Sequence, residues 1–255
     1  MRLDKCLADC GLGTRSEVKS LLKAKRITVN GKVVTNGKVQ VNPETDEILF
    51  DDEKIQYEEF VYMMMNKPKG VVSATEDNLH KTVLDLIDPL YFKKGVFPVG
   101  RLDIDTHGLL LLTNDGELAH RLLSPKKHVT KIYQARVEGV MTPEDAAAFE
   151  KGIVLSDGTE CMPARLDILS TTQDESIVQI HLKEGKFHQV KRMVKACGKT
   201  VVDLQRLTMG PLKLDESLAL GESRTLTEEE RESLMIHEKR KLRRNPRLLF
   251  VIERV

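Results

Sequence analysis

The sequence predicts an α+β fold in which a small unit of helices and a hairpin precedes a larger unit built on a mixed, largely antiparallel sheet. Residues 27–34 hold two short apolar runs around Asn30-Gly31, a pair that supplies the positive φ angles of a tight hairpin turn. Apolar and polar residues roughly alternate at 131–138 and at 177–183, which is typical of half-buried antiparallel strands. Helical patterns occur without the regular alternation of βαβ units. With 255 residues, 40% of them hydrophobic, the chain is long enough for two domains.

The first 40 residues predict two short helices followed by the hairpin. Leu3 and Leu7 lie four residues apart on a helix that we expect to end near Gly11. A second helix is expected after Thr14, which stands three residues before Glu17 in the spacing of a capping box. This region is basic, and its candidate polyanion-binding side chains are Arg15, Lys19, Lys23, Lys25 and Arg26.

The order helix, helix and basic hairpin resembles the small RNA-binding domain first seen in the fourth small-subunit ribosomal protein. The resemblance covers about the first 50–60 residues and implies that the basic side chains contact RNA phosphates. Residues 41–60 carry eight acidic residues and one lysine, a charge that keeps this stretch away from RNA. We therefore expect residues 1–60 to form a small RNA-binding domain that ends in an acidic linker.

Later segments predict the elements of the second unit. An apolar strand at Val61 to Met65 runs into a Pro/Gly turn at residues 66–70, and its methionine run is expected to be core. A helix is expected from Pro143 to about Lys151, with Thr142 as its cap and proline at its first position.

One short polar loop combines an arginine with two carboxylates and leads directly into a buried strand. The loop spans Gly100 to Gly108 and holds Arg101, Asp103 and Asp105, and the apolar run 109–113 ends at the turn signal Asn-Asp-Gly. Arg-Leu-Asp alone is uninformative, because it also occurs at residues 2–4 and 165–167. Only the middle copy has glycine on both sides and the leucine-rich run after it. Such a loop, held by a rigid core element, is a common place for catalytic groups.

This whole segment resembles the active-site motif of the pseudouridine synthases, specifically the ribosomal small-subunit (RsuA-like) family. The resemblance implies that Asp103 is the nucleophile and that the second unit has the fold of that catalytic domain. The Asn-Lys-Pro-x-Gly pattern at residues 66–70 matches the start of the family's catalytic domain. We accordingly expect residues 61–234 to form the catalytic domain and residues 235–255 a basic C-terminal tail.

The segment Glu184–Val194 places two cations in the first turn of a predicted helix. Apolar residues spaced three and four apart predict that this helix begins near His188. Lys191 and Arg192 then oppose the helix macrodipole, at a cost of roughly 0.3–1 kcal/mol each, unless a phosphate or a carboxylate offsets them or both side chains extend into water. The pattern Glu-Gly-x-x-His-Gln-Val-Lys-Arg-Met resembles the later motif of the same family. That resemblance implies that Lys191 pairs with Asp103.

A third segment, Lys131-Ile132-Tyr133, also resembles the family, whose Lys-x-Tyr pattern follows the aspartate at about this distance. A tyrosine on a strand is ordinarily a core or edge residue. The resemblance implies instead that Tyr133 stacks on the target base, a common way of holding an unpaired RNA base. Arg101 is expected to bind a phosphate or to help open the base stack. The predicted substrate-binding residues are thus Arg101, Tyr133, Lys191 and Arg192.

The resemblance implies an isomerase that converts a specific uridine of small-subunit (16S) ribosomal RNA to pseudouridine. The reaction breaks and remakes one bond between sugar and base, so no cofactor is expected. Two alternatives remain open: the same reaction on large-subunit (23S) ribosomal RNA, and a non-catalytic RNA-binding role in ribosome assembly.

The cysteines and the apolar runs of the sequence bear on which partners the protein binds and on where in the cell it is located. The four cysteines, Cys6, Cys10, Cys161 and Cys197, form no Cys-x-x-Cys pair, so we expect no metal. No apolar run approaches the roughly 20 residues of a membrane span, and no signal peptide is evident. We expect a cytoplasmic monomer whose partner is ribosomal RNA, with no membrane contact.

Overall fold

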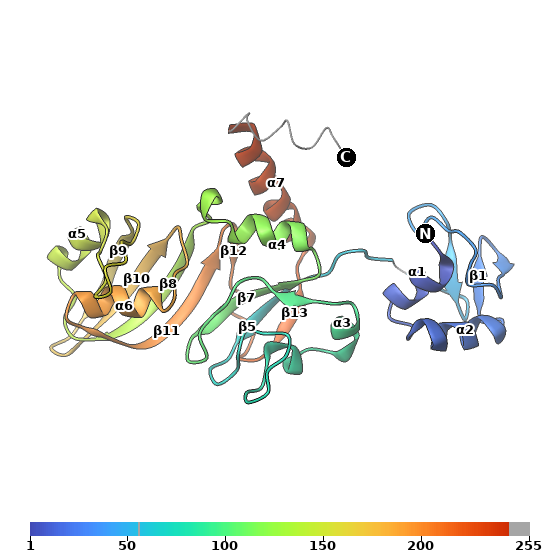
Figure 1. Cartoon of the computed structure of the whole chain (residues 1–255), viewed down its shortest axis with the longest axis horizontal. Coiled ribbons are helices and arrows are strands. Elements are labelled where there is room, and N and C mark those ends of the chain that lie inside the picture. The colour runs from blue at the N-terminus through green and yellow to red at the C-terminus, as the bar shows by residue number, and fades with distance from the viewer. Residues whose placement is uncertain (56, 245–255) are drawn as a thin grey trace. The chain divides into compact units, whose positions relative to one another are not determined.

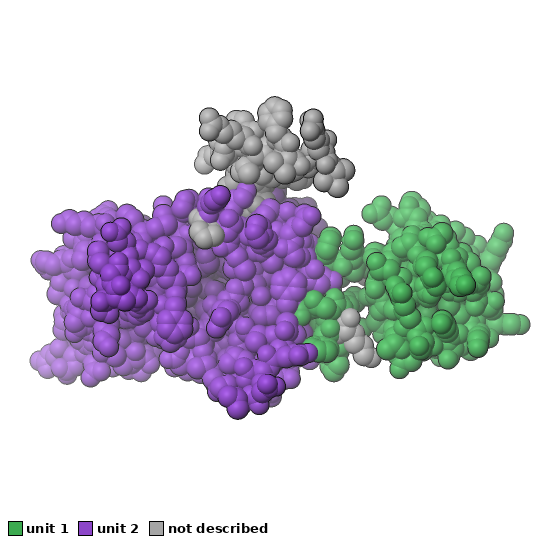
Figure 2. Space-filling view, in the orientation of Figure 1, with its two compact units in different colours: residues 1–61, 88–96 green, residues 62–87, 97–255 purple. Residues whose placement is uncertain are grey.

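The computed structural model describes residues 1–55 and 57–244, which form two compact units (Figures 1 and 2). The first unit contains Met1–Val61 together with Asp88–Val96, and the second contains Tyr62–Ile87 together with the chain from Phe97 onward. In Figure 2 the first unit is green and the second purple.

Two helices and a four-stranded antiparallel sheet build the main part of the first unit. The sheet has the strand order β2-β1-β3-β4. Leu3, Leu7, Val18, Leu22 and Ile27 are all nearly inaccessible to solvent and form its core. The elements of this unit are α1 (Leu3–Asp9), α2 (Arg15–Lys23), β1 (Ile27–Val29), β2 (Lys32–Val33), β3 (Ile48–Phe50), β4 (Glu53–Lys54) and α3 (Pro89–Lys93).

Local sequence signals produce these elements as predicted. Thr14 and Glu17 form the expected capping box at the start of α2. Asn30 and Gly31 have φ angles of 50° and 75°, which close the hairpin between β1 and β2. The acidic stretch is more ordered than a linker, because β3 and β4 lie within it and Asp51 forms an ion pair with Arg26.

A nine-stranded sheet forms the framework of the second unit, with the order β13-β5-β7-β11-β8-β10-β9 and with β12 and β6 paired to β11 and β7. Among the strand pairs of the described chain only β7 and β11 run parallel, so the sheet is mixed and largely antiparallel, as predicted. Its strands are β5 (Tyr62–Lys67), β6 (Phe97–Pro98), β7 (His107–Thr113), β8 (Lys131–Glu138), β9 (Arg165–Thr171), β10 (Glu175–Leu182), β11 (Thr200–Met209), β12 (Leu212–Lys213) and β13 (Ser223–Thr225).

The helices of this unit pack on two apolar clusters. One cluster joins α5 and α6 to strands β8–β11, and the other joins α4 and α7 to the strands around β7 (Figure 1). The bounds are α4 (Gly116–Leu123), α5 (Pro143–Lys151), α6 (Gln189–Ala196) and α7 (Glu228–Arg244), with short 3-10 turns at Val83–Leu86 and Pro125–Lys127. None of the helices in the described ranges is both long and apolar enough to cross a membrane.

Two differences from the predicted elements concern the ends of a strand and of a helix. The Asn-Asp-Gly signal after β7 does not only close a strand, because Asp115 accepts a hydrogen bond from the amide of Leu118 and thereby caps α4. Residue 235, the expected start of the basic tail, lies inside α7. Residues 245–255, the rest of that predicted tail, lie outside the described residues.

Candidate active site

The loop that carries Asp103 is anchored to the core on both sides. It connects β6 to β7, and the four leucines of β7 are completely buried. The hydroxyl of Ser73 lies 3.1 Å from both the amide nitrogen and the carbonyl oxygen of Leu102. The amide of Thr106 donates to the carbonyl of Asp103 at 3.0 Å. The backbone on either side of the carboxylate is therefore fixed by the fold.

Lys67, the last residue of β5, is a further anchor that the sequence reasoning missed. Its buried ammonium donates to the carbonyl oxygens of Pro68, Asp103 and Thr106 at 3.0, 3.1 and 2.9 Å. Burial lowers the pKa of Lys67 to about 8, although the nearby carboxylates Asp103 and Asp105 act in the opposite direction. The available signal was a lysine at the end of an apolar strand, directly before a proline. Its contacts indicate that Lys67 positions the loop.

Gly108 allows β7 and β11 to approach each other at the end of the loop. A Cβ at this position would lie 2.4 Å from the carbonyl oxygen of Arg206, and the φ angle of Gly108 is 103°. Arg206 pairs in register with Gly108 on one side and with Tyr133 on the other. Its guanidinium donates to the carbonyl of Leu109 at 2.8 Å. Tyr133 therefore lies on β8, which is separated by β11 from the strand that follows the Asp103 loop.

The carboxylate of Asp103 is held by the ammonium of Lys191, although the two residues are 88 positions apart. Lys191 Nζ lies 2.8 Å from Asp103 Oδ2 and 2.6 Å from Asp105 Oδ1. Burial lowers the pKa of Lys191, but its hydrogen bonds to the two carboxylates outweigh this and raise it. Burial likewise raises the pKa of Asp105, and the contact with Lys191 outweighs it and lowers that pKa. Lys191 thus has carboxylate partners at the start of α6, one of the alternatives considered for its charge.

His188 approaches the other oxygen of the same carboxylate. Its Nε2 lies 3.5 Å from Asp103 Oδ1, and its backbone caps α6 in the left-handed region with φ 47°. Sequence reasoning placed the helix start here but gave no role to His188, and it left Asp105 unassigned. The contact of His188 with Asp103 and that of Asp105 with Lys191 both join residues that are far apart in the sequence.

The other predicted site residues are placed as follows. Tyr133 is 9% exposed and shares a buried cluster with Leu102 and Val190, the neighbours of Asp103 and Lys191. Arg101 is exposed, and its side chain has no ion pair within the described ranges. Arg192 is directed to Asp157 at 2.5 Å and not to Asp103.

The basic side chains of the first unit are spread over α2 and the turn that follows it. Arg15, Lys19 and Lys23 are exposed and recur every four residues along α2, so they share one helix face. Lys25 is exposed as well, whereas Arg26 is paired with Asp51 and lies over the ring of Phe50.

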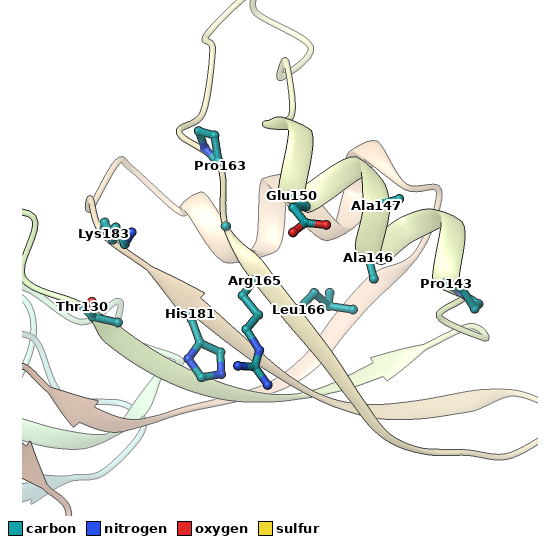
Figure 3. Close-up of a pocket in the computed structure, with 11 residues that line it drawn as sticks. Thr130, Pro143, Ala146, Ala147, Glu150, Pro163, Arg165, Leu166, His181 and Lys183 are labelled. Carbon is teal, nitrogen blue, oxygen red and sulfur yellow. The ribbon is translucent and has the colours of Figure 1, made fainter.

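A pocket of about 640 Å³ lies apart from these residues, between α5 and the strands β9 and β10 (Figure 3). Arg165, His181, Lys183 and Glu150 line it, whereas Asp103, Lys191 and Tyr133 do not. Over the described part of the chain, no three His, Cys, Asp or Glu side chains are arranged to hold a metal ion. Around Asp103 the structure places the ammonium of Lys191 and the imidazole of His188 against the carboxyl group.

Comparison with known proteins defines the family to which this chain belongs. Residues 61–196 match the family model for RNA pseudouridylate synthase, and residues 1–48 match the model for the S4 domain. The chain belongs to the RNA pseudouridylate synthase family, and it is an isomerase that takes RNA as its substrate.

Similar sequences narrow the family further and place the chain among the RsuA-type pseudouridine synthases. It is 42% identical to ribosomal small subunit pseudouridine synthase A of Haemophilus influenzae, over 92% of this chain and 100% of that one. It is 49% identical to an uncharacterized RNA pseudouridine synthase of Bacillus subtilis, over 90% of this chain and 96% of the relative. A solved structure described as a pseudouridylate synthase has a TM-score of 0.64 and 39% identity, and covers 92% of this chain and 99% of its own.

Proposed function

We propose that the chain converts a specific uridine of small-subunit (16S) ribosomal RNA to pseudouridine, with Asp103 as the nucleophile. The observation that carries the proposal is the carboxylate of Asp103, fixed on an anchored loop and paired with Lys191 at 2.8 Å. A nearby cation favours the ionised form of a carboxylate, which is the form that attacks. Relatives at about 40% identity are named for the small ribosomal subunit, which supports the choice of RNA.

The proposed reaction conserves all atoms of the nucleotide. Asp103 attacks the target nucleotide, the bond between N1 of uracil and C1′ of ribose breaks, and the uracil turns so that C5 faces C1′. The C5–C1′ bond then forms, C5 loses its proton, N1 gains one, and the carboxylate is released. The target base must leave its stack to reach Asp103, and Tyr133 is proposed to stack on it.

The remaining roles divide between the proposed domains. Residues 1–60 are proposed to dock the RNA, residues 61–234 to carry the reaction, and residues 235–255 to add basic contacts. Arg15, Lys19, Lys23, Lys25 and Arg26 bind phosphates in this proposal, and Arg101 and Arg192 do so near the target. Arg192 then has to exchange its ion pair with Asp157 for the phosphate.

The test is to treat unmodified 16S and 23S ribosomal RNA transcripts with the purified protein and to map pseudouridine in both. We expect a single position in the 16S RNA. A position in the 23S RNA alone would instead support the large-subunit alternative. RNA binding without any pseudouridine would support a non-catalytic role in assembly.

A further inference from the structure

The segment that leads into α6 presents an aromatic ring to solvent beside Asp103. Phe187 is 72% exposed, although burying such a side chain contributes about 1.5–3 kcal/mol to folding. Single exposed apolar residues are common on protein surfaces and need no explanation by themselves. Phe187 differs from such residues in its position and in its contacts.

Phe187 forms a stack with His188, and His188 in turn reaches Asp103. The two ring centroids are 3.8 Å apart and the ring planes differ by 18°. The imidazole Nε2 of His188 lies 3.5 Å from Asp103 Oδ1. The three side chains therefore form a continuous row from the carboxylate to the surface.

The backbone holds this row in a conformation that most side chains avoid. His188 has a φ angle of 47°, in the left-handed region, and it caps α6 without a capping hydrogen bond from its side chain. Such strained residues cost about 1–3 kcal/mol and cluster at functional sites. His188 is the N-cap of α6, so this backbone conformation lies at the start of the helix whose first turn carries Lys191.

The geometry of the stack decides which face of Phe187 is available. His188 covers one face of the ring, and the imidazole is the ring that contacts Asp103. The open face of Phe187 is therefore the one turned away from His188. Because Phe187 is 72% exposed, that face is accessible to the base of a nucleotide beside the one placed at Asp103.

We propose that Phe187, supported by His188, is a stacking platform for the base next to the target uridine. The proposal rests on the proposed function, because it places the target at Asp103. Every base has a π-face, so this platform tolerates any base but requires one to be present. Holding the neighbour outside while the target base turns inward fixes the RNA backbone at the point where the target leaves its stack.

The first experiment uses the absence of tryptophan from the chain. The Phe187→Trp variant has a single tryptophan, and its fluorescence is measured on adding a 16S RNA fragment that contains the mapped uridine. We expect quenching by the intact RNA and its loss when the neighbouring nucleotide on one side is made abasic. Leu169→Trp, at a 52% exposed position on β9, is the control. Equal quenching by intact and abasic RNA would overturn the proposal.

The second experiment measures conversion of the same RNA by Phe187→Leu and Phe187→Tyr. Leucine keeps an apolar side chain without an aromatic face, whereas tyrosine keeps the face. We expect Phe187→Leu to lose about 5- to 140-fold in kcat/KM, mostly through KM, and Phe187→Tyr to stay close to wild type. With the abasic RNA, Phe187→Leu should cause no further loss.

The outcomes separate this platform from the proposed function. If the wild type forms pseudouridine and the leucine and tyrosine variants are equally active, the platform is wrong and the proposed function stands. If the wild type forms no pseudouridine, the proposed function fails. The platform, which is defined by the base next to the modified uridine, then fails with it.

Discussion

The tripeptide Arg-Leu-Asp occurs in two places of the second unit with opposite outcomes. On β9, Arg165 and Asp167 are two residues apart on a strand, so their side chains lie on the same face and pair at 2.8 Å. In the loop before β7, Arg101 remains exposed and Asp103 is paired with Lys191 from α6. The backbone conformation around the tripeptide thus decides whether its aspartate forms an ion pair with its own arginine or with a residue far away in the sequence.

The copy at the start of the chain follows the β9 pattern. Arg2 donates to both carboxylate oxygens of Asp4, at 3.0 and 2.5 Å, and this contact holds the pKa of Asp4 below its usual value. The hydrogen bond from Arg165 likewise lowers the pKa of Asp167. An aspartate paired with the arginine of its own tripeptide is a structural group. Asp103 differs because its own arginine does not reach it.

The largest expected effect is that of Asp103→Asn, which we expect to lower single-turnover conversion by about 10⁴- to 10⁶-fold. An amide cannot replace a nucleophilic carboxylate. RNA affinity and the free energy of unfolding should change little. The matched variants Asp4→Asn and Asp167→Asn should keep activity within a few-fold. More than a tenth of wild-type turnover in Asp103→Asn would mean that the site is wrongly assigned.

The Asp103 loop is contacted by the buried Lys67, whereas the Arg-Leu-Asp copy on β9 lies in a regular strand. Lys67→Met tests this contribution of the buried lysine. The folded pKa of Lys67 is about 8, below the ordinary lysine value of 10.5, so the unfolded state binds more protons between these pH values. Unfolding free energy should therefore rise with pH between 8 and 10.5 more steeply in wild type than in Lys67→Met, by up to about 3 kcal/mol over the window. Parallel curves from urea unfolding at several pH values would contradict this.

Two variants of Tyr133 test whether this tyrosine only packs in the core or also stacks on a base. Tyr133→Ala should lose stacking worth about 1–3 kcal/mol in RNA binding, whereas Tyr133→Phe should bind with nearly wild-type affinity. Affinities for the 16S fragment, measured beside thermal unfolding, separate this from a packing defect. A loss of thermal stability in Tyr133→Ala with unchanged affinity would make Tyr133 a core residue only.

The smallest expected effect concerns the helix face of α2. Replacing Arg15, Lys19 and Lys23 by glutamine should reduce the slope of log affinity against log salt by about 0.7–0.9 for each phosphate that these side chains neutralise. Arg26→Gln should change the slope less, because Arg26 is already paired with Asp51. If the triple variant keeps the wild-type slope, this unit has no role in docking RNA.

Elements defined by neighbouring residues were predictable from the sequence. The strand 131–138, the helix from Pro143 to Lys151 and the capping box of Thr14 all formed as predicted, since each depends on residues within one or two turns. The helix α4 was missed because Asp115 and Gly116 suit both a turn and a helix start. The parallel pairing of β11 with β7 was missed because it joins residues almost 100 positions apart.

The same distinction applies to the site. The context of Asp103 and the two cations of α6 are visible in the chain, and the resemblance joined Asp103 to Lys191. The roles of Lys67, Asp105 and His188 come from contacts over 36 to 86 positions. In the sequence, the residues next to these three gave no indication of such distant contacts.

The claim that surroundings and not the tripeptide make Asp103 reactive is tested most directly at Lys191. Single-turnover conversion and RNA affinity are measured for Lys191→Gln and Lys191→Arg. We predict that glutamine lowers the rate about 100-fold with a much smaller loss of affinity, because Asp103 loses its cation, and that arginine restores most of the rate. An unchanged rate with weaker binding in Lys191→Gln would make Lys191 a phosphate contact and contradict the account.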